Sequence, residues 1–277
     1  MRGLYDLSIY INELETAKYA AVAAGAAIME VYGESDFEVE YKSDSSPLTV
    51  ADKKANDIIV KILTERFPGH AILSEESESD ARRLDNDLCF IVDPLDGTKE
   101  FIKRNGQFTV NIALAYKHKS VMGVIYVPVT KELFFAAENY GAYFEGHEGH
   151  IVKLKVSDRT ENIRMVMSLS HGHPCEQELI EKYKITEFVK MGSSLKGCLI
   201  ARGDAEVYYR FNPTMEWDTA AMQIIAEEAG AVFRQMDGTE MRYNRQNPVN
   251  EKGFFIVSCE ENVLGYNSRG AGNDSID

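Results

Sequence analysis

Residues 88–98 have the sequence LCFIVDPLDGT, in which a short apolar run leads directly into two aspartates. A run of this kind favours a buried strand, which we expect to cover Leu88–Val92 and to stop at Asp93. The proline of the following turn restricts the backbone and the glycine lets it bend tightly, so Asp93 and Asp96 would face the same side. Asp-Pro and Asp-Gly are also ordinary turn dipeptides that need no function. This stretch predicts a strand end that carries two carboxylates.

Two further acidic segments lie at expected element boundaries: Ser74-Glu75-Glu76-Ser77 and Trp217-Asp218. Each has an ordinary explanation by itself, because acidic runs are usually solvated and Trp-Asp can begin a helix as a cap. Together they allow Glu75 and Asp218 to join the two aspartates of the turn. Four carboxylates at close range repel and raise each other's pKa unless cations neutralise them. Oxygen ligands suit hard ions, above all Mg²⁺, and carboxylate-held Mg²⁺ is common in phosphate-ester hydrolysis.

The spacing of apolar residues predicts two different halves of the chain. Helices are expected at 11–32 and 51–67, and Thr49 with Asp52 forms a capping-box-like start for the second. A short strand is expected at 71–73. Apolar segments separated by turns over 108–144 imply an antiparallel meander.

After about residue 155, expected strands alternate with expected helices, which suggests a second α/β layer. The strands are expected at 165–170, 187–191, 205–211 and 254–259, and the helices at 175–183, 193–202 and 217–229. We therefore expect a layered α/β protein. Its antiparallel-rich N-terminal lobe, 1–155, would bind metal, and a mixed-sheet C-terminal lobe, 156–266, would complete the substrate site. The tail at 267–277 has no apolar content and is expected to be disordered.

Composition narrows the class of partner. The formal net charge of −14 over 277 residues argues against a nucleic-acid polymer, although bound metals would reverse the local sign for a small phosphorylated ligand. No apolar stretch is long enough to span a bilayer, and the first residues lack the apolar core of a secretion signal. The four cysteines are far apart, and Cys89 and Cys198 lie in apolar runs, so we expect reduced thiols and a cytoplasmic location.

Other phosphate chemistries fit the sequence poorly. Covalent aspartyl phosphatases use Asp-x-Asp-x-Thr near the start of the chain, whereas two residues separate Asp93 from Asp96 here. That spacing would misplace the general acid. The sequence also contains neither a GxxxxGK[ST] loop nor a GxGxxG unit, which weighs against NTPases and dinucleotide enzymes.

The three acidic motifs, in this order and ending in WDTAA at 217–221, resemble the inositol monophosphatase superfamily of Mg²⁺-dependent, lithium-sensitive phosphatases. The resemblance runs from about the first helix to the last strand. DGTKEF at 96–101, FTVN at 108–111 and GSSLK at 192–196 are similar to the 3′(2′),5′-bisphosphate nucleotidases of the CysQ type. The resemblance implies an alternating α-β-α-β-α sandwich of the sugar-phosphatase type.

The resemblance also implies roles for individual residues. Asp52 and Thr98 would orient and deprotonate the attacking water, with Glu75 also at the catalytic centre, and the amides of Gly97 and Thr98 would contact the phosphate. Hydrolysis would be direct in-line attack by water, with charge neutralisation supplying most of the rate. Two to three Mg²⁺ ions would be held by Glu75, Asp93, the Leu95 carbonyl, Asp96 and Asp218.

The substrate side follows the same resemblance. Ser168 and His171 match the family's Ser-x-Ser-His segment, Gly192 and Lys196 match a nucleotide-side loop, and Arg210 would neutralise a second phosphate. Judged without the family, His171 is a surface turn residue and Lys196 a solvated helix residue. The full substrate-binding set implied is Glu75, Leu95, Asp96, Gly97, Thr98, Ser168, His171, Gly192, Lys196, Arg210 and Asp218.

The predicted function is hydrolysis of adenosine 3′,5′-bisphosphate to AMP and phosphate, with the sulfated precursor as a second substrate and a role in sulfur metabolism. One alternative is an inositol-1-phosphatase or a sugar bisphosphatase on the same scaffold. Another is a catalytically silent sensor of metal or nucleotide. The sequence leaves monomer and homodimer open, and loose attachment at the cytoplasmic face of the inner membrane is an alternative to a fully cytoplasmic location.

Overall fold

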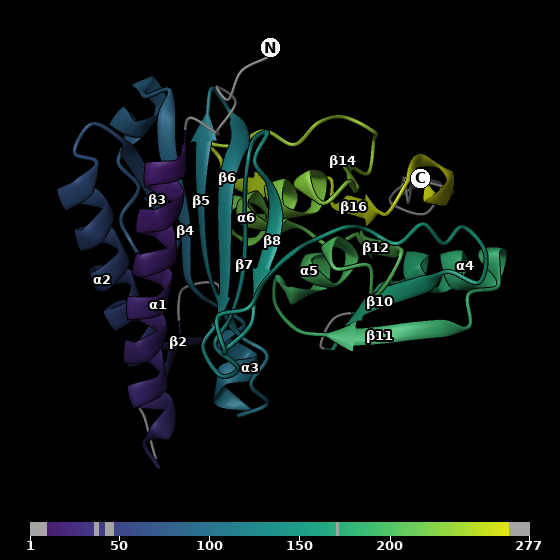
Figure 1. Ribbon diagram of the computed structural model, residues 1–277, viewed down its shortest axis with the longest axis horizontal. Helices are drawn as coiled ribbons and strands as arrows, with labels where there is room; N and C mark the ends of the chain where they lie inside the picture. Colours follow the sequence, from purple (N-terminus) through teal and green to yellow (C-terminus); the bar gives the residue numbers. More distant parts are fainter. Residues whose placement is uncertain (1–9, 36–38, 42–46, 170–171, 266–277) are drawn as a thin grey trace, which may run out of the picture.

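The computed structural model describes residues 10–35, 39–41, 47–169 and 172–265, and these form five alternating layers (Figure 1). Two long helices cover one face of a large sheet, two helices lie between this sheet and a second one, and a further helix covers the outer face of the second sheet. In this order the helices are α1 (Ile11–Gly33) with α2 (Val50–Arg66), α5 (Leu195–Ala201) with α6 (Glu216–Glu228), and α4 (Pro174–Tyr183). The expected α-β-α-β-α sandwich is confirmed.

The large sheet has seven strands in sequence order, β3 to β9. Only the β3–β4 pair is parallel, and every later pair is antiparallel, which confirms the predicted meander. Its strands are β3 (Ala71–Ser74), β4 (Leu88–Asp96), β5 (Thr109–Tyr116), β6 (Lys119–Val127), β7 (Glu132–Ala137), β8 (Gly141–Glu145) and β9 (Ile151–Lys153).

The second sheet has five strands in the order β11-β10-β12-β16-β14. Strand β10 is parallel to β11 and β12, whereas β16 is antiparallel to its neighbours, so this sheet is mixed as expected. Its strands are β10 (Arg164–Ser168), β11 (Glu187–Met191), β12 (Val207–Arg210), β14 (Val232–Gln235) and β16 (Phe254–Val257).

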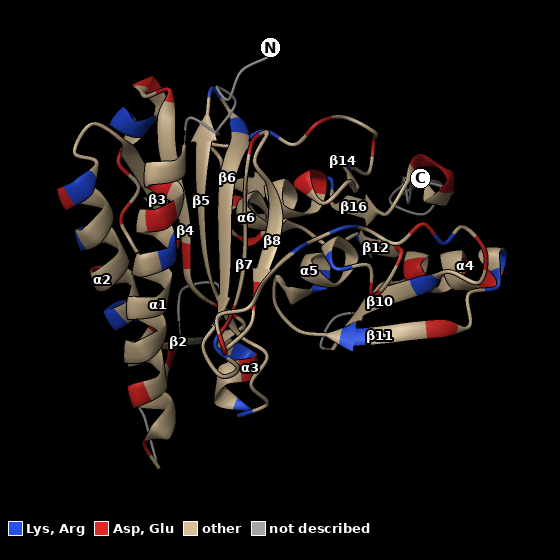
Figure 2. Cartoon of the chain, in the orientation of Figure 1, with Lys and Arg blue, Asp and Glu red and all other residues tan. Residues whose placement is uncertain are grey.

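Smaller elements connect these layers. Two two-stranded ladders and three short helices occur in the described part of the chain. They are β1 (Val39–Tyr41) with β2 (Pro47–Thr49), β13 (Thr214–Met215) with β15 (Val249–Asn250), helix α3 (Thr98–Ile102), and the 3₁₀ helices η1 (Ala81–Asp85) and η2 (Glu260–Asn262). Among the described helices, none combines the length and the apolar character needed to cross a bilayer. Both acidic and basic side chains occur along α2 and α4 (Figure 2).

Alternation along β4 builds two of the three cores. Phe90 and Val92 pack with α1 and α2, whereas Ile91, on the opposite face of the sheet, packs with α5 and α6. The third core lies between the second sheet and α4. The middle core takes residues from both halves of the chain, and we propose on this ground that residues 1–155 and 156–266 are two lobes of one unit.

The structure corrects two predicted boundaries. Strand β4 does not stop at Asp93 but continues to Asp96, because β5 pairs with both residues across an irregular step in the register. Pro94, which has no N–H to donate, lies within that step. Helix α5 begins at Leu195 rather than at 193, because Ser193 has a left-handed backbone with φ of 46°. The predicted disordered tail lies outside the described residues.

Helix α6 packs against β6 so closely that only glycine fits at position 123. A β-carbon there would lie 2.6 Å from the carbonyl oxygen of Ala221 and 2.6 Å from the Ile224 side chain. The Gly123→Ala substitution must therefore push α6 away from the sheet. We expect it to lower the free energy of unfolding by about 1–3 kcal/mol, measured by urea denaturation.

The matched control is Gly33→Ala at the end of α1, where an added β-carbon meets nothing within 4 Å. This variant should be neutral or more stable by up to about 1 kcal/mol, because alanine favours a helix. Equal stability of the two variants would contradict the close packing described for α6.

Candidate active site

The irregular end of β4 brings its two aspartates to one side, as the sequence predicts. Asp93 is 2% exposed, and one of its carboxylate oxygens accepts a hydrogen bond from the Leu95 N–H at 3.0 Å. Gly97 follows with φ of 95°, a conformation that glycine adopts without strain, and it leads into α3. The chain thus reverses directly after Asp96.

Two helices supply further aspartates in the same way. Asp52 is the third residue of α2, and its Oδ2 accepts hydrogen bonds from the N–H of Thr49 at 2.8 Å and from the Thr49 hydroxyl at 2.6 Å. The capping box predicted there is confirmed. Asp218 is the third residue of α6, and its Oδ2 accepts the N–H of Met215 at 2.7 Å. Asp218 therefore lies one turn inside its helix and is not the cap residue itself.

Three of the four predicted carboxylates meet. One oxygen each of Asp93, Asp96 and Asp218 lies within 4.8 Å of the others. Glu75 is outside this group but lines the same cavity as Asp96 and Asp218, and its charge acts on Asp93 and Asp218. Its N–H donates to the Val92 carbonyl at 3.1 Å, which places Glu75 beside β4.

Asp96 uses its two oxygens for different purposes. Its Oδ2 accepts the N–H of Ser194 at 2.6 Å and the side-chain amide of Asn111 at 3.4 Å. Ser194 also bonds to Asn111 at 2.8 Å, so these residues form one network that holds the carboxylate from β5 and from the start of α5. The other oxygen of Asp96 remains for a ligand.

Asp52 lies beside Thr98. The Thr98 hydroxyl donates to Oδ1 of Asp52 at 3.2 Å and lies 3.4 Å from the carbonyl oxygen of Leu95. Because the capping bonds of Asp52 occupy only its Oδ2, its Oδ1 is available to Thr98. The structure thus brings this predicted catalytic pair together at the edge of the carboxylate cluster.

The carboxylates are unfavourable as anions in this arrangement. Burial is the largest cause and raises the pKa of Asp93, Asp96 and Asp218, the last to about 8. The neighbouring negative charges raise the pKa of Asp93 and Asp218 further. Burial also raises the pKa of Asp52, against the hydrogen bonds from Thr49. Divalent cations would remove this penalty, and an all-oxygen donor set of this charge fits Mg²⁺.

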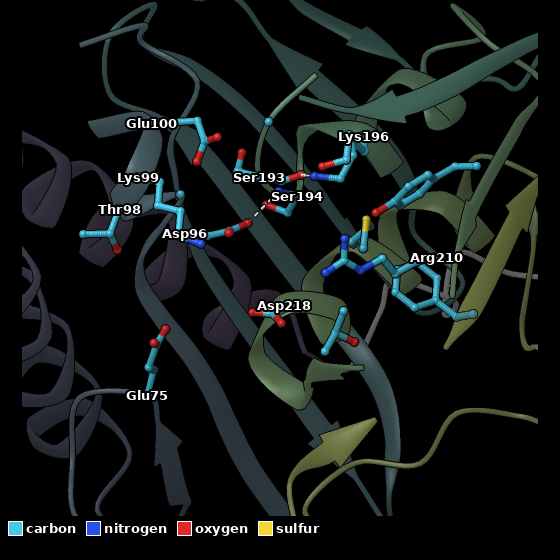
Figure 3. Close-up of a pocket in the computed structure, with 17 residues that line it drawn as sticks. Glu75, Asp96, Thr98, Lys99, Glu100, Ser193, Ser194, Lys196, Arg210 and Asp218 are labelled. Carbon is cyan, nitrogen blue, oxygen red and sulfur yellow. Dashed lines mark hydrogen bonds between the residues drawn. The ribbon is translucent and has the colours of Figure 1, made fainter. Parts of the chain in front are cut away.

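Asp96, Asp218 and Glu75 line a cavity with a volume of about 320 Å³, and cationic side chains lie on its opposite side (Figure 3). Lys196 and Arg210 approach from the side away from Thr98 and Glu75 (Figure 3). Lys196 is 9% exposed and donates to the Ser193 carbonyl, so it is not the solvated residue that its position on a helix would suggest. Burial lowers the pKa of Lys196, while the charge of Asp96 opposes that shift.

Two buried polar atoms at this cavity have no hydrogen-bond partner within the described part of the chain. They are Nε of Arg210 and the hydroxyl oxygen of Ser193, both buried within residues that line the cavity. A buried polar atom without a hydrogen bond is costly, and a ligand in the cavity could supply the missing partner. Ser193 was not predicted from the sequence, although its position inside the GSSLK motif was the available signal.

The remaining predicted residues divide into two groups. Gly97, Gly192 and Ser168 line the cavity. A β-carbon on Gly192 would lie 3.0 Å from the Glu100 side chain, so the absence of a side chain at position 192 allows this close packing. His171 lies outside the described residues. Glu100, Asn111 and Ser194 were not predicted as site residues, although they lie within the motifs DGTKEF, FTVN and GSSLK.

Comparisons with known proteins agree with this site. The chain matches the model of the inositol monophosphatase family over residues 11–261. It is 41% identical over 246 residues to the 3′(2′),5′-bisphosphate nucleotidase CysQ of Salmonella typhimurium, which covers 88% of this chain and 99% of that protein. The corresponding protein of Escherichia coli K12 is 40% identical over 235 residues, covering 84% and 94%.

A solved structure agrees as well. CysQ from Bacteroides thetaiotaomicron, described as a bacterial member of the inositol monophosphatase family, superposes with a TM-score of 0.80 at 42% identity. The match covers 93% of this chain and 100% of that chain. The chain belongs to the inositol monophosphatase family, which confirms the resemblance found from its motifs.

The raised pKa values predict how stability depends on pH. An aspartate with a raised pKa holds a proton in the folded protein that the unfolded chain releases above about pH 4. Stability contributed by Asp218 is therefore present below about pH 4 and is lost as the pH rises through about 8. In EDTA we expect the melting temperature to fall between pH 6 and pH 9, and Mg²⁺ to raise it more at pH 9. The Asp218→Asn variant should lose much of this pH dependence, and an unchanged pH profile would contradict the assignment.

Proposed function

We propose that this protein is a Mg²⁺-dependent 3′(2′),5′-bisphosphate nucleotidase that converts adenosine 3′,5′-bisphosphate to AMP and phosphate. The observation that carries the proposal is one cavity with two opposite sides. Asp96 and Asp218 line one side, with a carboxylate oxygen of Asp93 within 4.8 Å of theirs, and would bind cations, whereas Lys196 and Arg210 line the other side and would bind an anion. A substrate with two phosphates fits both sides at once, whereas a monoester needs only the first. The nucleotidase relatives support the same choice.

The residues that would hold the metal are Glu75, Asp93, Asp96, Asp218 and the Leu95 carbonyl. Bound Mg²⁺ would neutralise the carboxylates and the phosphate oxygens, and so favour attack on phosphorus. The protein's own part is to hold these ligands in place before the metal arrives. The hydrogen bonds to one oxygen of Asp96 and one of Asp218 do this and leave the other oxygens free.

Water activation would rest on Thr98 and Asp52. The Thr98 hydroxyl donates a hydrogen bond to Asp52. The lone pairs of the hydroxyl oxygen can therefore accept a hydrogen bond from a water in the cavity. As the water attacks phosphorus, its proton would pass to Thr98 while that of Thr98 passes to Asp52. The bond between phosphorus and the 3′ oxygen would break, that oxygen would take a proton from solvent water, and Asp52 would return its proton to solvent. The raised pKa of Asp52 makes it a better proton acceptor than an exposed aspartate.

Finer features of the function are proposals too. We infer two to three Mg²⁺ ions, inhibition by Li⁺, and the sulfated nucleotide as a second substrate, all from the family resemblance. The cytoplasmic location, loose attachment to the inner membrane face, and the choice between monomer and homodimer stay predictions.

The first test compares phosphate release from adenosine 3′,5′-bisphosphate and from inositol 1-phosphate, with Mg²⁺ and then with added Li⁺. We expect lithium-sensitive turnover of the nucleotide and much slower turnover of the inositol ester. Asp96→Asn should lower the rate by more than about 100-fold, because it removes a ligand charge. Asp57→Asn, an exposed position on α2, is the matched control and should keep the rate. Preference for the inositol ester would refute the assignment of a nucleotide substrate but would still agree with the proposed metal site.

Arg210 gives a second, sharper test. Its unpartnered Nε should bind the 5′-phosphate, and a hydrogen bond to a charged group is worth about 1.5–3 kcal/mol. We expect Arg210→Gln to raise KM for adenosine 3′,5′-bisphosphate about 10- to 100-fold with little change in kcat. Hydrolysis of adenosine 3′-monophosphate, which lacks that phosphate, should be almost unaffected. Equal losses on both substrates would show that Arg210 does not distinguish them.

A further inference from the structure

A hydrogen-bonded loop connects two segments that carry proposed metal ligands. One is the chain that follows Glu75, and the other is the start of α6 with Asp218. Residues 244–250, called the clamp loop below, lie between β14 and β16, end in the short strand β15 and contact η1 at the other end. Arg83 of η1 is 4% exposed and donates to the Asn244 side chain at 2.6 Å and to the Arg245 carbonyl at 2.7 Å. Asn244 donates back to the Arg83 carbonyl at 2.9 Å. Arg83 also donates to the Ser79 hydroxyl at 3.1 Å, which ties it to the chain leaving Glu75.

The clamp loop contacts the first residue of α6 at the same time. Glu216 has no exposed surface, and its carboxylate accepts the N–H of Asn244 at 2.5 Å. It also accepts the N–H of Arg245 at 3.0 Å and the Nε of the Arg245 guanidinium at 3.0 Å. Glu216 lies two residues before Asp218, so these bonds hold the helix turn that carries a proposed metal ligand.

The far end of the clamp loop holds the same turn from its other side. The Asn250 amide donates to the Met215 carbonyl at 2.9 Å and to the Thr219 hydroxyl at 3.1 Å. Arg245 donates to the Asn250 side-chain oxygen at 2.5 Å, and the N–H of Glu216 donates to the Pro248 carbonyl at 2.9 Å. The start of α6 is therefore fixed independently of the metal site.

We propose that Glu216, Arg245 and Arg83 are positioning residues that set the Mg²⁺ affinity by fixing Asp218 relative to the Glu75 side of the cavity. This inference takes from the proposed function only the identity of the metal, Mg²⁺. A ligand set is effective when its supporting hydrogen bonds hold the ligands at the right separation, and weakening such bonds lowers metal affinity.

The chain contains a matched ion pair outside the site. Glu206 likewise has no exposed surface and accepts the N–H of Arg164 at 2.6 Å and its guanidinium at 2.5 Å. Arg164 is 27% exposed, close to the 32% of Arg245. This pair joins β10 to the start of β12, and neither residue lines the cavity. Loss of either pair should cost stability, but only loss of the first should alter metal binding.

The experiment compares Glu216→Gln with Glu206→Gln in the full chain. Trp217 is the only tryptophan and is adjacent to Asp218, so its fluorescence can report titration with Mg²⁺ alone, without substrate. The Mg²⁺-dependent rise in melting temperature gives an independent measure. We expect Glu216→Gln to raise the Mg²⁺ dissociation constant about 10- to 100-fold, the range typical of residues behind a metal ligand, and Glu206→Gln to change it less than about twofold.

Activity adds a further distinction. At saturating Mg²⁺, Glu216→Gln should recover most of its kcat, because it keeps every proposed ligand. If Glu216→Gln does not fold, Arg83→Lys serves instead, since lysine keeps the charge but loses the two-pronged geometry. Equal Mg²⁺ dissociation constants for the site variant and Glu206→Gln would overturn the inference. Tight Mg²⁺ binding by the parent protein without nucleotide hydrolysis would refute the proposed function and leave this inference standing.

Discussion

The repulsion between three clustered carboxylates, one buried and two half-buried, is the constraint on which the rest of this structure depends. Asp93, Asp96 and Asp218 lie close enough to share a cation, and burial together with mutual charge raises the pKa of Asp93 and Asp218. Left alone, such a cluster would push its elements apart. The sandwich resists this by pairing β4 with a strand on each side and by holding α6 between two sheets. The stability of the fold thereby keeps the ligands of the proposed metal site together.

The same local solution appears twice at the site. In both α2 and α6 an aspartate at the third helical position bonds back to the backbone N–H three residues earlier with one oxygen. The other oxygen of Asp52 faces Thr98, and Asp218 contributes an oxygen to the carboxylate cluster. A helix start fixes such a side chain more firmly than a loop would, because its backbone is already ordered. This division of labour lets one residue serve both folding and chemistry.

Much of this arrangement was predictable from the sequence, because the relevant signals are local. Apolar runs followed by acids placed the strand and helix ends, and the Thr49–Asp52 spacing gave the capping box. The continuation of β4 through Pro94 was not predictable, since it depends on pairing with a later strand. The contacts of Arg83 with residues 244 and 245 were equally hidden, because hydrogen bonds over such sequence separations leave no periodic pattern.

The hydrogen bonds accepted by the two oxygens of Asp52 determine the direction in which a proton can move. One oxygen accepts bonds from Thr49 and the other accepts the Thr98 hydroxyl, so every hydrogen bond points toward the carboxylate. An asparagine at this position would keep one acceptor for the helix start and would turn an N–H₂ group toward Thr98. The hydroxyl would then have to rotate and offer its hydrogen to the cavity. A nearly isosteric change would thus leave the helix intact and reverse the polarity of the whole chain of hydrogen bonds, from proton acceptance to proton donation.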